Sequence, residues 1–286
     1  MKGRLLAFLA ASALICPAAV AQNNKSKETT TKETTMVRTE TKAVASGYDL
    51  LSNWNFDDST PVTTGTVSLR LGYQYWTQSE EQSRGDRDDD HVINPQIFWG
   101  AAEGLEISVS VPVWVGDSGE TGDNGEGNAD TYLAFLWNFL PDQDGFSMAL
   151  KGAVRAPTGD NSNGVDGELR LILSHQCSES VRGHINAFAI SANGDNDEDL
   201  RNFHWGAVFG LDGPLFGDES LRWVADYMHR SGEHFGSRNI NMLELGTEWT
   251  IDASNRLASG IQIGLDDNED TPNFGARLTY AYSIGY

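Results

Sequence analysis

Residues 274–286 read FGARLTYAYSIGY, and they carry the most regular pattern of the chain. Large apolar side chains recur at every second position, and the positions between them are small or polar. A period of two predicts a β-strand with one apolar face and one polar face. The apolar positions are Leu278, Tyr280, Tyr282, Ile284 and Tyr286.

Tyrosine dominates the apolar face of this strand, and the stretch ends on an aromatic ring. That pattern is typical of a lipid-facing strand whose rings lie at the level of the lipid headgroups. The stretch resembles the C-terminal strand signal of bacterial outer-membrane β-barrels. The resemblance implies that Tyr280, Tyr282 and Tyr286 lie at the membrane interface and form the signal read by the barrel assembly machinery.

The amino-terminal residues predict export. A basic start with Lys2 and Arg4 precedes an apolar run over Leu5–Ile15, and Ala19-Val20-Ala21 offers small residues for cleavage. This is the layout of a secretory signal peptide over residues 1–21, and it is too short for a membrane-spanning helix. We therefore expect cleavage after Ala21 and delivery to the outer membrane of a Gram-negative envelope.

Composition excludes several classes of protein. No apolar run of about eighteen residues follows the signal peptide, so no transmembrane helix is expected. The formal net charge of -21 argues against nucleic acid as a partner, because phosphates would be repelled. Acidic loops suit a surface where divalent cations bridge protein to lipopolysaccharide, so we expect outer-membrane lipid and lipopolysaccharide as partners.

Residues 22–63 predict an extension in front of the barrel. Asn23–Ala45 is rich in Thr, Lys and Glu and offers little to bury, so it is expected to be a disordered tether. Asp49–Thr60 carries Trp54 and Phe56, which leaves two alternatives open, a short plug-like segment or a periplasmic one.

Residues 64–286 predict the barrel itself. Alternating segments of about ten residues, the length of a tilted membrane strand, follow one another with short and long connections in turn. We expect an all-β, closed antiparallel transmembrane β-barrel of about twelve strands, since closure leaves no exposed edge. A soluble β-sandwich would instead bury the Tyr280 and Tyr282 face against protein. The segments are Thr66–Thr77, Val92–Gly100, Leu105–Val115, Ala129–Leu140, Phe146–Ala156, Glu168–Gln176, Arg182–Ala192, Phe203–Leu211, Leu221–Arg230, Met242–Ile251, Leu257–Leu265 and Phe274–Tyr286.

Charged residues fill many of the positions that alternate with the apolar faces, so they are predicted to line the lumen. They could form a basic ladder that guides small anionic solutes, or they could pair with acidic neighbours across a filled lumen. Arg70 and Arg277 lie on the first and last segments and are expected to meet on closure. The predicted lumen residues that contact solute are Arg70, Lys151, Arg155, Arg170, Arg222, Arg230, Glu244 and Arg277.

Signatures of enzymes and of metal sites are absent from the sequence. It contains no nucleophile elbow, no His-Glu-x-x-His, no Cys-x-x-Cys and no phosphate loop. The acidic loops at Asp195–Asp199 and Asp266–Asp270 lack the glycine of an EF-hand at the sixth position, where Leu200 and Thr271 stand. We predict no catalysis, no cofactor and no metal site.

Two glycine-and-turn motifs carry a further resemblance. Gly127–Leu133 opens one segment, and Ala156–Asp160 closes the next one. Together they resemble the outer-membrane transporter family named for the MetA pathway of phenol degradation, over Thr66–Tyr286. That family typically has Gly-x-Gly-Asp at the first site, whereas this chain has Gly127-Asn128-Ala129-Asp130. The resemblance implies uptake of small organic compounds, including aromatic ones.

The sequence thus predicts an outer-membrane channel or facilitator for passive passage of small solutes, anionic or aromatic in kind. The alternative is a structural or surface-interaction barrel with a plugged lumen and acidic, cation-binding loops. An open path beside the lumen arginines favours the channel, and a salt-bridged plug favours the structural barrel.

Overall fold

The structure is a computed structural model of the chain. It describes residues 54–77, 89–115, 127–128, 130–159, 164–191, 202–232, 238–266 and 273–285. The predicted signal peptide, the predicted tether, Tyr286 and most of the two acidic loops lie outside the described residues. Within the described residues, no helix is long and apolar enough to cross a membrane.

Strands form almost all of the regular structure in the described residues. Period-two alternation, as in TVSLRLGYQYWT of β1, makes each strand apolar on one side and polar on the other. The elements are β1 (Thr66–Thr77), β2 (Asp89–Ala102), β3 (Leu105–Ser110), β4 (Val113–Trp114), β5 (Gly127–Asn128), β6 (Thr131–Gln143), β7 (Phe146–Ala156), β8 (Asp166–Gln176), β9 (Arg182–Ser191), β10 (Phe203–Leu215), β11 (Asp218–Arg230), β12 (Ile240–Thr250), β13 (Asn255–Gly264) and β14 (Phe274–Gly285).

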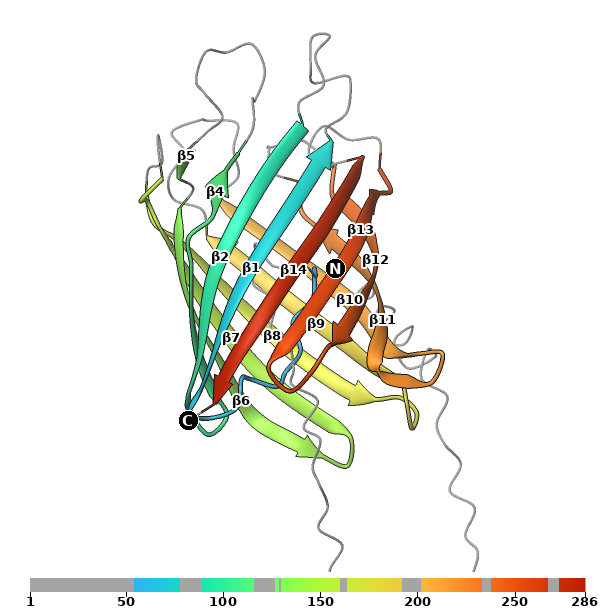
Figure 1. Cartoon of the computed structure of the whole chain (residues 1–286). Helices are drawn as coiled ribbons and strands as arrows, with labels where there is room; N and C mark the ends of the chain where they lie inside the picture. Colours follow the sequence, from blue (N-terminus) through green and yellow to red (C-terminus); the bar gives the residue numbers. More distant parts are fainter. Residues whose placement is uncertain are drawn as a thin grey trace, which may run out of the picture.

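These elements close into a barrel (Figure 1). Neighbours in sequence pair antiparallel, and β1 pairs with both β2 and β14, which joins the two ends of the sheet. Because β3 and β4 continue one another, as do β5 and β6, the described residues form twelve strands around the barrel. The predicted fold is confirmed.

The third predicted strand, Leu105–Val115, is interrupted where it was expected to be continuous. Val111 and Pro112 separate β3 from β4. Proline has no N–H to donate to the ladder, so the hydrogen-bonded pairing breaks there. The wall resumes through Val113, which pairs with Asn128 of β5.

The outer face of the barrel is apolar. On β1, Leu69, Leu71 and Tyr73 are exposed, while the alternate positions Arg70 and Gln74 are buried. On β14, the exposed side chains include Leu278, Tyr280 and Tyr282. So much exposed apolar surface indicates a lipid-facing belt. The soluble sandwich is excluded because the Tyr280 and Tyr282 face is not buried against protein.

The connections are sorted by length, as predicted. Asp144–Gly145 and Phe216–Gly217 are two-residue turns in which both residues have positive φ, the geometry of type I′ hairpins. The predicted segments Phe203–Leu211 and Leu221–Arg230 left a longer connection over Asp212–Ser220, and this prediction is wrong, because β10 continues to Leu215 and β11 begins at Asp218. Short turns lie at the end where β1 begins, which is the periplasmic end in outer-membrane barrels.

The lipid-facing assignment can be tested at Leu71, which lies mid-strand on β1 and is 54% exposed. We expect Leu71→Arg to lower the free energy of unfolding from lipid bilayers by about 2–4 kcal/mol, because a charge would face hydrocarbon. Phe216→Arg is the matched control. Phe216 lies at a turn tip and is 95% exposed, so a loss of under about 1 kcal/mol is expected. Equal losses in a denaturant titration would contradict the assignment.

Candidate functional site

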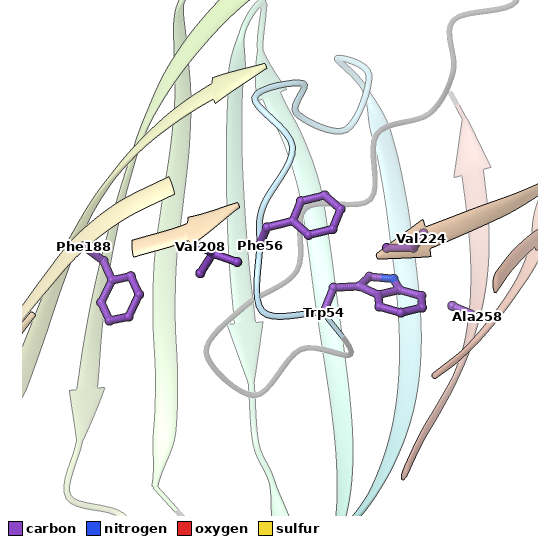
Figure 2. Close-up of a cluster of buried hydrophobic side chains, with 6 residues drawn as sticks. All are labelled: Trp54, Phe56, Phe188, Val208, Val224 and Ala258. Carbon is purple, nitrogen blue, oxygen red and sulfur yellow. The ribbon is translucent and has the colours of Figure 1, made fainter. Parts of the chain in front are cut away.

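The lumen contains a piece of the chain itself. Residues 54–63, which we call the plug segment, precede β1 and fold back inside the barrel. Trp54, Phe56, Asp57, Ser59 and Val62 are all less than 5% exposed. Figure 2 shows Trp54 and Phe56 on this segment, among side chains of the surrounding strands. Of the two alternatives that the sequence left open for this region, the described residues form the plug-like one.

Two aromatic rings anchor the plug segment against glycines of the wall. The Trp54 indole fills space next to Gly246 of β12 and Gly260 of β13; a Cβ atom on Gly260 would lie 2.9 Å from Trp54 Cζ3. The Phe56 ring lies over Gly210 of β10, where a Cβ atom would come within 2.7 Å of it. Larger side chains at these glycines would displace the rings, so the glycines define the niches.

Phe56 and Trp54 also join an apolar cluster inside the lumen. Phe56 stacks on the imidazole of His184, with ring centroids 4.6 Å apart and an interplanar angle of 23°. The cluster is apolar although it lies on the polar side of the wall, and it forms only because the plug segment brings two rings to it. Its members are Trp54, Phe56, Phe188, Val208, Val224 and Ala258 (Figure 2).

Asp57 is bound to the wall through both its carboxylate and its main chain. Its carboxylate accepts from Lys151 Nζ at 3.1 Å and from Arg170 Nη1 at 2.9 Å. Asn186 holds the main chain at the same point: its Oδ1 accepts from Asp57 N at 2.6 Å, and its Nδ2 donates to Asp57 O at 3.0 Å. Asp57 is fully buried, so these ion pairs are shielded from solvent.

Asp58 makes a second ionic contact, with Arg182 of β9 at 2.9 Å. Burial would raise the pKa of the Asp58 carboxyl, but the charges of Arg182 and His184 and the N–H of Thr60 hold that pKa below its ordinary value. Arg182 also contacts Asp212 of β10 at 3.4 Å. The plug segment is therefore tied to β9 and, through Arg182, to β10.

Asn55 lies at the centre of a polar network on the other wall. Its main-chain N–H donates to Glu244 Oε2 at 3.0 Å, and its side-chain amide donates to Asp226 Oδ1 at 2.9 Å. Gln262 donates to Asn55 Oδ1 at 3.1 Å, and Arg277 pairs with Glu244 at 3.4 Å. Strands β11 to β14 thus each contribute one group to this network.

The remainder of the plug segment contacts the first half of the barrel. Ser59 N donates to Ser174 Oγ at 3.2 Å, and Asn138 Nδ2 donates to Ser59 O at 2.7 Å. Val62 N donates to Glu106 Oε2 at 2.8 Å. Because these contacts lie nearer the end where β1 begins, the segment runs from that opening toward mid-barrel.

The predicted lumen residues do point inward, and four of them meet around the plug segment: Lys151, Arg170, Glu244 and Arg277. The other four lie elsewhere on the inner wall. Arg70 stacks on Phe98, with Cζ 3.7 Å from the ring centroid, and Arg155 pairs with Asp130 and Asp166. Arg222 pairs with Asp212 and Glu219, and Arg230 is half-buried at the end of β11.

Arg70 and Arg277 were expected to lie close together, and this prediction is wrong. Their strands are neighbours, but the two residues are not paired in the register. Arg70 lies opposite Ala281, and Arg277 lies opposite Gln74. The offset of four residues separates the two positions by about 13 Å along the strand. Each arginine instead has a contact of its own, Arg70 with Phe98 and Arg277 with Glu244.

Sequence reasoning missed Asp57, Asp58, Arg182 and Asn186. It also missed a chain of hydrogen bonds in which Ser174 Oγ lies 2.9 Å from His184 Nδ1, and His184 Nε2 lies 2.6 Å from Asp212. These are the residue types of a catalytic triad, but the serine faces Nδ1 instead of Nε2 and is engaged by Ser59 of the plug segment. All three are buried. We therefore assign Ser174, His184 and Asp212 a structural role, which is to anchor the plug segment.

The two glycine-and-turn motifs meet in space. Asp130 Oδ1 accepts from the main-chain N–H groups of Thr158 at 3.1 Å and Gly159 at 3.0 Å, and Thr158 Oγ1 accepts from Thr131 N at 2.9 Å. The aspartate of the first motif therefore fixes the turn of the second. Asp130 is buried as well. This gives the motifs a structural role at the outer ends of β6 and β7.

Comparison with known proteins identifies the fold. The barrel is similar to an outer membrane channel from Pseudomonas putida F1, with a TM-score of 0.67 and 15% identity over 81% of this chain and 100% of that one. It is also similar to the NanC porin, with a TM-score of 0.54 and 9% identity over 76% of this chain and 100% of that one. For the KdgM porin the TM-score is 0.50, with 10% identity over 75% of this chain and 99% of that one. No protein-family model matches the chain. No curated protein matches it either.

The chain therefore has the fold of the porin-like outer-membrane β-barrel channels. That fold and the apolar outer belt together place the barrel in the outer membrane. The resemblance to outer-membrane barrels is thereby confirmed. The finer resemblance to the phenol-degradation family stays a prediction.

Asp57 offers a direct test of how the plug segment is held. We expect Asp57→Asn to raise the hydrogen-exchange rates of residues 54–63 by roughly a hundredfold or more, because removing one partner of a buried ion pair costs about 3–5 kcal/mol. Glu103→Gln, in an exposed turn, is the control and should leave these rates unchanged. Unchanged protection in Asp57→Asn would show that the ion pairs do not hold the segment.

Acid should also loosen the plug segment. The pKa of Asp58 is lower in the folded barrel, so its contribution is present above the ordinary aspartate value of about 3.9 and lost as pH falls through the lowered value. We expect opening of residues 54–63, from hydrogen exchange corrected for intrinsic rates, to stay constant from about pH 7 to 5 and to rise below about pH 4. A rise at neutral pH would contradict this assignment.

Proposed function

We propose that this protein is an outer-membrane channel for passive passage of small anionic solutes, closed in this conformation by its own plug segment. It performs no turnover chemistry; the lumen side chains bind and orient solute and steer it by charge. The observation that carries the proposal is the set of cations around Asp57 and Asp58, namely Lys151, Arg170 and Arg182.

The plug segment supplies carboxylates to these cations. If it leaves the lumen, Lys151 and Arg170 lose Asp57, and Arg182 loses Asp58. The vacated passage would then present Lys151, Arg170 and Arg182 at mid-barrel, with Arg170 still paired with Glu168 and Arg182 still paired with Asp212. Their positive charge would attract anions. Among proteins that share the fold, the KdgM porin has been solved in complex with oligogalacturonate, a solute that carries carboxylates.

The second candidate is a structural barrel that stays plugged. It is favoured by the number of polar contacts to the plug segment, which reach both halves of the wall. Against it stands the covalent connection of the plug segment: among the described residues, the segment joins the wall only through Thr64 and Gly65. The other contacts are non-covalent and can break.

The sequence also suggested aromatic solutes, and the niche occupied by the Phe56 ring supports including them.

Single-channel recording in planar bilayers separates the two candidates. We expect wild-type protein to open rarely, and Asp57→Asn with Asp58→Asn to open about a hundredfold more often with a preference for anions. Adding Lys151→Gln and Arg170→Gln should keep the openings and abolish the anion preference. Glu103→Gln with Asp144→Asn changes the same charge in exposed turns, so it should behave as wild type.

Folding of each variant is checked by circular dichroism before recording. If the Asp57→Asn, Asp58→Asn variant folds and inserts but shows no channel openings, the proposed channel function is contradicted and the plugged structural barrel is supported. Openings with a preference for cations would contradict the assigned role of Lys151, Arg170 and Arg182.

A further inference from the structure

We infer that the lumen is a binding site for short acidic peptides and that the plug segment is its built-in ligand. The inference rests on the proposed function, because an external peptide must enter the lumen to reach the site. The residues that define the ligand are Trp54–Ser59, which read Trp-Asn-Phe-Asp-Asp-Ser. The ligand class is an extended peptide in which an aromatic residue precedes two carboxylates.

Recognition of main-chain atoms indicates a peptide. Asn186 binds both the N–H and the C=O of Asp57, as a neighbouring β-strand would. Glu244 accepts the N–H of Asn55, and Arg170 Nη1 donates to its C=O at 3.2 Å. Two further wall residues bind the N–H and C=O of Ser59, and they are Ser174 and Asn138.

A simple carboxylate would not satisfy this site. Benzoate or succinate offers no amide groups at these spacings, so the buried wall groups would lose the hydrogen bonds that they make to the main chain of the plug segment. Each such loss would weaken binding by about five- to 150-fold. The wall therefore discriminates peptides from small acids by the same logic that makes unpaired polar groups costly in any recognition site.

Side-chain contacts then set the sequence preference. Phe56 fills the niche between Gly210 and His184, which selects a ring at the position before the first carboxylate. Lys151 and Arg170 bind the first carboxylate, and Arg182 binds the second. A peptide with amides in place of the two carboxylates would lose all three ion pairs.

The plug segment competes with any external ligand. It is joined to β1 by only two residues, Thr64 and Gly65, so its effective concentration at the site is on the order of millimolar or higher. A free peptide of equal intrinsic affinity would then bind wild-type protein only at comparable concentrations. Weakening the plug segment should expose the site.

Fluorescence anisotropy with a labelled peptide in detergent tests the inference on the full chain. The probe is Trp-Asn-Phe-Asp-Asp-Ser with blocked ends, and the control probe carries Asn at both Asp positions. The protein is the Asp57→Asn, Asp58→Asn variant, with Asn55→Ala added if hydrogen exchange still protects residues 54–63. We expect the acidic probe to bind this variant at least tenfold more tightly than it binds wild type, and at least tenfold more tightly than the control probe binds.

Two further measurements define the ligand class. Asn186→Ala in the same variant should weaken the acidic probe at least fivefold, since the only atoms of the plug segment that Asn186 binds are main-chain atoms of Asp57; its Oδ1 also accepts from Arg170 Nη1 at 3.5 Å. Succinate and benzoate at a hundredfold excess should not displace the probe. Equal binding of the two probes would overturn the acidic-peptide site, because the carboxylates would not be recognised. Displacement by either small acid would overturn it in favour of a general anion passage.

Failure of this inference differs from failure of the proposed function. Anisotropy needs no ion flow, so a barrel that binds the acidic probe but stays silent in bilayers would contradict the channel alone. A folded variant that conducts anions and binds no probe would overturn the peptide site alone.

Discussion

The pairing of Asp57 with Lys151 and Arg170 inside the barrel is the interaction on which the arrangement of the lumen depends. A wall that faces lipid on one side must place its polar groups on the other, and this barrel concentrates ionisable side chains there. Charges in a narrow, poorly solvated space require partners. The plug segment brings carboxylates, an amide and main-chain groups to the wall. It thereby provides partners for many of the polar and charged side chains that the alternation of the strands points inward.

The same pairing explains why aromatic and glycine residues occur on a polar face. Trp54 and Phe56 need space within the lumen, and Gly210, Gly246 and Gly260 provide it. In a strand taken alone these glycines only weaken the β-structure. Beside the plug segment they allow close approach, so aromatic packing and ion pairing act together along one short stretch of chain. The segment is held on several sides at once, which fixes its register in the lumen.

The fold could be predicted from the sequence because it depends on a local signal. Alternation within Thr66–Thr77 and Phe146–Ala156 was sufficient to predict β1 and β7 with the bounds that the structure has. Inward orientation of Arg70 and Arg277 follows from the same alternation. Their distance does not, since it depends on the stagger between the two strands that close the ring. The site was harder still, because Asp57 meets partners 94 and 113 positions away along the chain. No periodicity within a strand reports such a contact.

Closure between β1 and β14 constrains how this barrel can assemble. The plug segment is continuous with β1, and β1 bonds to the last strand of the chain. When β1 pairs with β14 and the barrel closes, any segment that lies inside it at that moment is enclosed. The segment must therefore occupy the interior before the seam closes, or else enter afterwards from the end of the barrel where β1 begins. In the first case the segment acts as an internal template on which the strands gather, so its residues would shape the order of assembly as well as the finished wall.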